Sequence, residues 1–63
     1  MGERITLTPL LLRADEAAKV LSLSRTKVFE LIGSGELRSV KIGHLRRVPA
    51  TALEEYVARL EVA

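Results

Sequence analysis

The sequence predicts an α+β fold that is mostly α, built from a pair of short helices, a β-hairpin and a C-terminal helix. The helix pair is indicated by apolar residues at helical spacing in two neighbouring stretches, 14–21 and 25–32. The hairpin is indicated by two alternating runs, 38–42 and 45–48, on either side of a turn that contains glycine. A third helical pattern begins near Pro49, and no repeat, low-complexity segment or linker interrupts this order.

The length and composition of the chain indicate one small domain without disulfides or metal ligands. We expect this domain to cover residues 1–63, with residues 1–9 as an N-terminal extension in which 4–8 alternate like a short edge strand. A chain of this length buries only about 60% of the surface that its unfolded form exposes, so its stability margin is small. The absence of cysteine excludes disulfides and thiolate ligands, and one histidine cannot form a metal cluster. No apolar run reaches the ~18 residues of a membrane span, and we expect a cytoplasmic protein.

The two helical stretches are separated by only three residues. Arg13, before the first stretch, is a poor cap, so we expect this helix start to fray or shift by one residue. Ser24, before the second stretch, has a hydroxyl that can accept a hydrogen bond from a free N–H group. The residues that we expect to be buried are Ala17, Ala18 and Leu21, and Val28, Leu31 and Ile32. So short a link forces a tight turn, which is the helix-turn-helix arrangement, whose second helix can enter the major groove of DNA.

The hairpin and the C-terminal helix follow the helix pair. Gly43 and His44 join the two alternating runs, and a hairpin that follows a helix-turn-helix is the wing of a winged-helix domain. The fold predicted is therefore a winged helix-turn-helix with a two-stranded wing. The last helix should begin between Pro49 and Thr51 and fray after Leu60, since proline is tolerated in a first helical turn. Its apolar stripe, which we expect to close the core, is Leu53, Tyr56, Val57 and Leu60.

The basic residues are concentrated in the middle third of the chain. The net charge is only +2, but residues 25–47 hold six basic and two acidic side chains, a surplus of four. A clustered basic surface suits a polyanion such as double-stranded DNA. No nucleophile–base pair, metal cluster or phosphate-binding loop is visible, so we expect neither an enzyme nor a cofactor or small-molecule ligand.

The candidate DNA contacts are the outward residues of the second helix and of the hairpin. On the helix they are Ser24, Arg25, Thr26, Lys27 and Glu30, and on the hairpin they are Lys41, Gly43, His44, Arg46 and Arg47. Arg25 is the best base reader, because its planar fork matches O6 and N7 of guanine. Thr26 either touches a thymine methyl group or a phosphate, or is an ordinary surface residue. Glu30 accepts from cytosine, orients a basic neighbour or faces solvent, and we favour the last two.

The other candidates have competing structural interpretations. Ser24 is a helix cap first and a phosphate contact second, and Gly43 serves the backbone of the turn. The basic hairpin residues either protect the strand edges from aggregation or contact phosphate and the minor groove. His44 can donate to phosphate, whereas a catalytic or metal role is not expected. Phe29, beside the buried stripe, is interpreted as the edge of the core rather than as a stacking platform.

The order of motifs resembles that of a known family. The motifs are Leu11-Leu12-x-Ala14-Asp15-Glu16-Ala17-Ala18, Ser24-Arg25-x-x-Val28-x-x-Leu31-Ile32, Ser34-Gly35-Glu36-Leu37, Val40-Lys41-Ile42-Gly43 and Arg47-Val48-Pro49. Over about residues 10–60 this set resembles the excisionase-like small helix-turn-helix proteins, relatives of the MerR-type winged helix. The chain departs from the family pattern at Arg13, at Ser22, where glycine is frequent, and at Arg46, where an aromatic residue is frequent.

The resemblance implies a monomeric protein that binds DNA through the second helix and the wing, and we expect such a protein to be associated with the nucleoid. The resemblance also implies a recombination directionality factor, which bends DNA and recruits an integrase for the excision of a prophage or integrative element, with several copies side by side on repeated sites. A small transcriptional regulator is the alternative that the same domain allows. A protein-interaction module, with the C-terminal helix docked on a partner, is the alternative of a different class.

Overall fold

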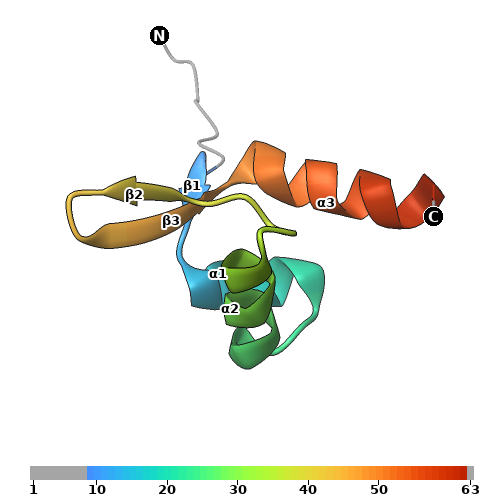
Figure 1. The fold of residues 1–63 in the computed structure, drawn as a ribbon, viewed down its shortest axis with the longest axis horizontal. Coiled ribbons are helices and arrows are strands. Elements are labelled where there is room, and N and C mark those ends of the chain that lie inside the picture. Colours follow the sequence, from blue (N-terminus) through green and yellow to red (C-terminus); the bar gives the residue numbers. More distant parts are fainter. Residues whose placement is uncertain (1–8, 63) are drawn as a thin grey trace, which may run out of the picture.

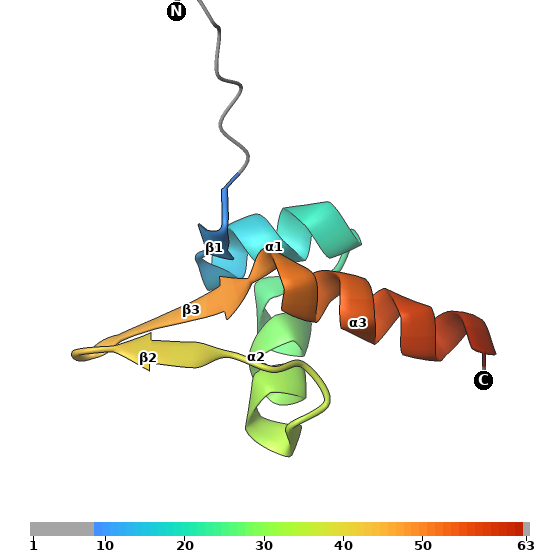
Figure 2. The same ribbon diagram turned by 90° about the horizontal axis from the view of Figure 1, so that it is seen from above.

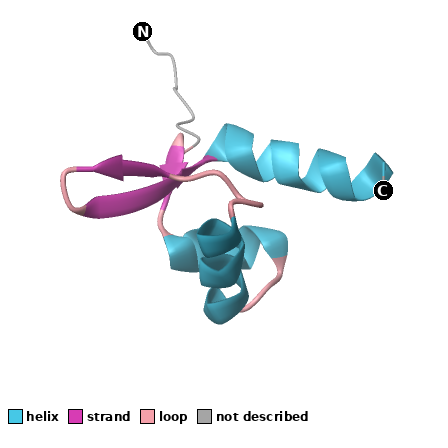
Figure 3. Ribbon diagram, viewed as in Figure 1, coloured by secondary structure: helices cyan, strands magenta, loops and turns pink. Residues whose placement is uncertain are grey.

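The computed structural model describes residues 9–62 and contains three helices and a small antiparallel sheet (Figures 1 and 3). In chain order the elements are β1 (Leu11–Leu12), α1 (Ala14–Leu21), α2 (Arg25–Ser34), β2 (Val40–Ile42), β3 (Leu45–Pro49) and α3 (Ala50–Val62). The β2–β3 hairpin and α3 project in opposite directions from the α1–α2 pair and β1 (Figures 1 and 2). The predicted α+β class, mostly α, is confirmed. The strand expected over 4–8 lies outside the described residues.

Both helices of the α1–α2 pair begin where the sequence predicts. α1 begins at Ala14 without a shift, because the Glu16 carboxylate accepts a 2.8 Å hydrogen bond from the backbone N–H of Arg13. This bond is the half of a capping box that Glu16 supplies, while the Arg13 side chain makes no capping hydrogen bond. At the start of α2, the Ser24 hydroxyl accepts a 3.1 Å hydrogen bond from the backbone N–H of Lys27, which confirms Ser24 as a helix cap.

The turn between α1 and α2 contains a residue in the left-handed conformation. Ser22 has φ 59° and ψ 40°, and within residues 9–62 it is the one non-glycine residue with a positive φ. Its backbone N–H donates to the Lys19 carbonyl at 3.2 Å, and the N–H of Leu23 donates to the Ala18 carbonyl at 2.9 Å. These bonds satisfy carbonyl groups that the end of α1 leaves free, and they direct the chain into α2.

The hairpin has its two predicted strands, β2 and β3, and the structure adds a third strand, β1, that the sequence did not indicate. The order of the sheet is β1–β3–β2 and both pairings are antiparallel. The residues opposite each other in the added pairing are Leu11 and Pro49, and Leu12 and Val48. Pro49 has no N–H group, but the next residue, Ala50, donates to the Leu10 carbonyl at 2.8 Å and prolongs the pairing. A strand of two residues is too short for its alternation to be recognised in the sequence.

The core lies between the α1–α2 pair, the sheet and the first half of α3. Its buried side chains are Leu12, Ala17, Ala18, Val28, Leu31, Leu37, Val48, Ala52, Leu53 and Tyr56. Leu21 and Ile32, predicted as buried, are only half-buried at its edge. α2 ends with Gly35 in the left-handed conformation (φ 86°), and this turn brings Leu37 into the core, where its N–H donates to the Leu31 carbonyl at 3.1 Å.

α3 corrects the predicted core at its outer half. The helix begins at Ala50, within the predicted range, but it continues to Val62 instead of ending at Leu60. Val57 and Leu60 are 38% and 57% exposed, although their spacing predicted burial. The reason is geometric, because the outer turns of α3 extend beyond the α1–α2 pair (Figures 1 and 2) and the buried core ends at Tyr56. Within residues 9–62, no helix combines the length and the apolar character of a membrane span.

Arginine contacts hold the segment between α2 and β2 against α3. The Arg38 guanidinium donates to both Glu55 carboxylate oxygens, at 3.3 and 3.1 Å, and to the Thr51 hydroxyl at 3.1 Å. From the next turn of α3, Arg59 donates to the backbone carbonyl of Glu36. The base of the hairpin is therefore fixed to α3 by polar contacts as well as by the core.

Candidate nucleic-acid interface

The outward face of α2 carries the predicted contacts. Arg25, Thr26, Lys27 and Glu30 are all exposed, while Val28 and Leu31 bury the opposite face. At 3.6 residues per turn, Thr26 and Glu30 point away from the core, and Arg25 and Lys27 lie on opposite flanks. Phe29 shares the flank of Arg25, one turn further along the helix, so α2 presents a mixed polar and aromatic surface.

The charged side chains of α2 differ in their pairing. The Lys27 ammonium lies 3.8 Å from a Glu30 carboxylate oxygen, an exposed i,i+3 pair. This pair is compatible with both favoured interpretations of Glu30, because its carboxylate lies near a basic neighbour and is also exposed to solvent. Arg25 has no ion pair within residues 9–62; its guanidinium carbon lies 5.8 Å from the centre of the Phe29 ring, a cation–π arrangement. Of the two basic residues of this helix, Arg25 is thus the one without an ion pair in the described part of the chain, and it lies on the flank that faces the sheet.

The β2–β3 hairpin places its basic residues around an exposed tip. Gly43 and His44 form the turn, and Gly43 has φ 62°, a left-handed value that explains the glycine there. Lys41 lies directly opposite Arg46 in the register, so two like charges share one face of the hairpin. The pair Ile42 and Leu45 flanks the turn and is 51% and 45% exposed. Like charges directly opposite each other destabilise a hairpin in isolation, which favours a site that an anion occupies.

The arginines of the hairpin are held by different contacts. The Arg46 guanidinium donates to the Ser39 hydroxyl at 2.9 Å, and this side chain is exposed. Val48, two residues further along β3, is buried in the core. The Arg47 guanidinium donates to the backbone carbonyl of Arg46 at 2.9 Å. Neither arginine is paired with a carboxylate in the described part of the chain. Their positive charge therefore remains available to a ligand.

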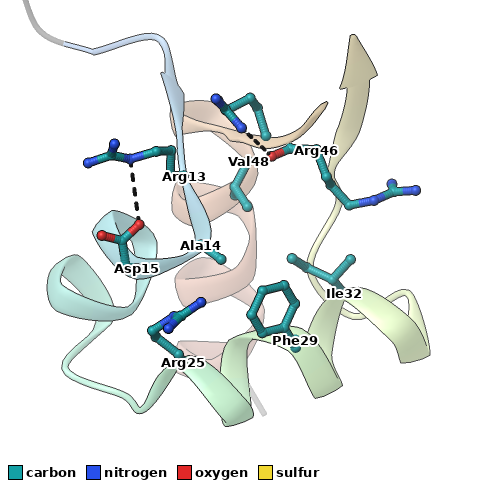
Figure 4. A pocket seen from close by; sticks show the side chains of 9 residues that line it. Arg13, Ala14, Asp15, Arg25, Phe29, Ile32, Arg46 and Val48 are labelled. Atoms are coloured by element: carbon teal, nitrogen blue, oxygen red, sulfur yellow. Dashed lines mark hydrogen bonds and ion pairs between the residues drawn. The ribbon is translucent and has the colours of Figure 1, made fainter. Parts of the chain in front are cut away.

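A cleft of about 300 Å³ separates α2 from β3, and it is the feature that joins the two candidate elements (Figure 4). α2 contributes Arg25, Phe29 and Ile32, and β3 contributes Arg46, Arg47 and Val48. The third side is the start of α1, residues 13–15, where Arg13 is paired with the carboxylates of Asp15 at 3.6 Å and Glu16 at 3.5 Å. The cleft is thus lined by both apolar and charged side chains. Three of its arginines, from elements far apart in the sequence, have no carboxylate partner within residues 9–62.

The structure brings together part of the predicted set. Arg25, Arg46 and Arg47 meet at the cleft, whereas Lys27 lies on the far flank of α2 and His44 lies at the hairpin tip. Two features were missed. Phe29 is 50% exposed and lines the cleft, so its interpretation as core edge is only half right; its signal was the i,i+4 spacing from Arg25. Arg38, counted in the basic surplus, is neutralised by Glu55, a partner that no local spacing indicates.

Comparison with known proteins gives a consistent result. Residues 11–61 match the family model described as a helix-turn-helix domain. A probable excisionase of Saccharopolyspora erythraea is 57% identical over 51 residues, which are 81% of this chain and 52% of that protein. An excisionase of Streptomyces ambofaciens is 40% identical over 52 residues, which are 82% of this chain and 84% of that protein. The chain thus spans about half the length of the first relative and most of the second. No solved structure matches the chain significantly.

Proposed function

Since this chain belongs to the excisionases of the helix-turn-helix domain family, which are non-catalytic DNA-binding proteins, we propose that it binds specific sites in double-stranded DNA and promotes excision by an integrase. The observation that carries this proposal is the cleft between α2 and β3. Arg25 of α2 and Arg46 and Arg47 of β3 line it, and none of the three has a carboxylate partner within residues 9–62. The site of action is then the DNA of the nucleoid, in the cytoplasm.

In this proposal α2 enters the major groove and the β2–β3 hairpin acts as the wing of a winged helix. Arg25 reads guanine through O6 and N7, with Thr26 and Lys27 beside it. The hairpin holds the adjacent backbone through Lys41, His44, Arg46 and Arg47, with Gly43 shaping the turn, and these contacts position the protein without reading sequence. The like-charged pair at the hairpin supports this role, because phosphate groups relieve its repulsion.

A footprint on the DNA that flanks the gene of this protein, over a salt series, tests the binding. Each phosphate neutralised contributes about −0.9 to the slope of log K against log salt, so affinity should fall steeply as salt rises. Protection of short direct repeats beside an integrase gene supports excision, with neighbouring copies side by side. Protection of a promoter alone supports the alternative, a small transcriptional regulator. Absence of protection at low salt contradicts DNA binding and favours a protein-interaction module.

We place the contact with the integrase on the outer half of α3. Leu60 and Val62 are 57% and 84% exposed there, and Val57 lines an apolar groove between α1 and α3 that does not include the arginine cleft. An excision assay with the cognate integrase tests the assignment with the variant Leu60→Glu. We expect this variant to keep its footprint and to lose excision, whereas Arg47→Ala should weaken both. Unchanged excision by Leu60→Glu contradicts the placement on α3.

A further inference from the structure

Phe29 is the one phenylalanine of the chain, and half of its surface is exposed on the helix proposed to enter DNA. Its neighbours on the outward face of α2 are polar or charged. Single exposed apolar residues are ordinary on protein surfaces, so exposure alone indicates nothing. The position of Phe29 is more informative, because its ring lines the cleft together with Arg25 and lies one helical turn after it (Figure 4).

The ring and the Arg25 guanidinium form one unit. The guanidinium carbon lies 5.8 Å from the ring centre, and neither group has a competing charged partner within residues 9–62. When Arg25 approaches the edge of a guanine, the Phe29 ring is carried to the floor of the same groove. An apolar ring finds one strongly apolar group there, the 5-methyl group of thymine.

We propose that Phe29 is a specificity-determining residue that reads thymine by packing its ring against the 5-methyl group. The inference rests on the proposed DNA binding and adds a base to it. Residues four positions apart on a helix are about 6 Å apart along its axis, and successive base pairs are about 3.4 Å apart. The thymine therefore lies one or two base-pair steps from the guanine that Arg25 reads.

The test uses the protected site with each thymine replaced, one at a time, by deoxyuridine. This change removes the 5-methyl group and keeps Watson–Crick pairing. The Kd is measured for the wild type, for Phe29→Ala and for Leu10→Ala, a control whose side chain is 80% exposed and lies outside the cleft. At one thymine we expect about fourfold weaker binding by the wild type and by the control, which corresponds to about 0.8 kcal/mol for one buried methyl group. The affinity of Phe29→Ala should fall by less than about twofold at that thymine, because the ring that contacts the methyl group is absent.

Two results overturn the assignment of Phe29. One is a wild-type scan in which no thymine is sensitive to loss of its methyl group; this scan needs no variant, so it decides even if Phe29→Ala unfolds. The other is an equal fourfold loss in Phe29→Ala and the wild type, which means that another residue touches the methyl group. In both cases the protein still binds the site. Failure of the proposed DNA binding is distinguishable from both results, because the wild-type protein would then protect no site in the footprint.

Discussion

Ser22→Gly is expected to stabilise the protein, because Ser22 occupies a left-handed backbone conformation in the turn of the helix pair. Its φ of 59° and ψ of 40° cost an L-residue roughly 1–2 kcal/mol relative to glycine. Glycine loses more freedom on folding, which offsets about 0.5–1 kcal/mol. The Ser22 side chain is exposed and makes no hydrogen bond within residues 9–62, so its removal adds no further cost. The net gain is about 0.5–1 kcal/mol.

Thermal unfolding followed by circular dichroism measures this gain. For a domain of this size, 1 kcal/mol corresponds to about 4–8 °C, so the Tm should rise by about 4 °C. The control is Ser34→Gly in the last turn of α2, where the hydroxyl donates to the Leu31 carbonyl at 3.1 Å. This second change should lower the Tm, because it removes that bond and adds freedom to the unfolded chain. A Tm that is unchanged or lowered by Ser22→Gly refutes the argument from backbone conformation.

Three other predictions separate the arginines by role. Arg25→Ala should cost about 1–3 kcal/mol of binding and relax base preference at one position; competition with a set of single-base variants measures this, and an unchanged preference contradicts base reading. Arg47→Ala should weaken binding to all DNA sequences alike and lower the slope of log K against log salt by about one, which a salt titration measures. An unchanged slope excludes a phosphate contact by Arg47. Arg38→Ala should lower the free energy of unfolding by about 0.5 kcal/mol through loss of the half-exposed Glu55 pair and leave the salt slope unchanged; a lower slope indicates that Arg38 leaves Glu55 for DNA.

The parts of the fold that the sequence predicts well have local causes. α1 has its predicted bounds and α2 its predicted start, because apolar spacing and the Ser24 cap act within a few residues. The hairpin is equally local, since Gly43 marks its turn. β1 is different, because two residues carry no recognisable alternation and their partner strand lies at the far end of the hairpin.

In the candidate site, too, the features with local causes could be predicted from the sequence and those with tertiary causes could not. Exposure of Arg25, Thr26 and Lys27 follows from the helical period of α2 and the burial of the opposite face. The charge that each cation presents to a ligand does not follow from the sequence, because it depends on tertiary partners. Arg38, for example, is paired with Glu55, seventeen positions further along the chain. The apolar stripe of α3 also predicted burial that no neighbouring element provides at its outer turns.

No loop residue separates β3 from α3. β3 ends at Pro49, whose φ is fixed by its ring, and α3 begins at the next residue. The start of α3 is held in two places, because the Ala50 N–H donates to the Leu10 carbonyl and the Glu55 carboxylate accepts from Arg38. For a protein bound to DNA through α2 and the hairpin, the direction of α3 around the duplex axis is therefore fixed. The spacing between adjacent sites then determines toward which side of the duplex each α3 points. Shifting one site by half a helical turn, about 5 base pairs, moves its α3 to the opposite side of the duplex. That α3 is then out of reach of an integrase bound on the side that a neighbouring copy faces.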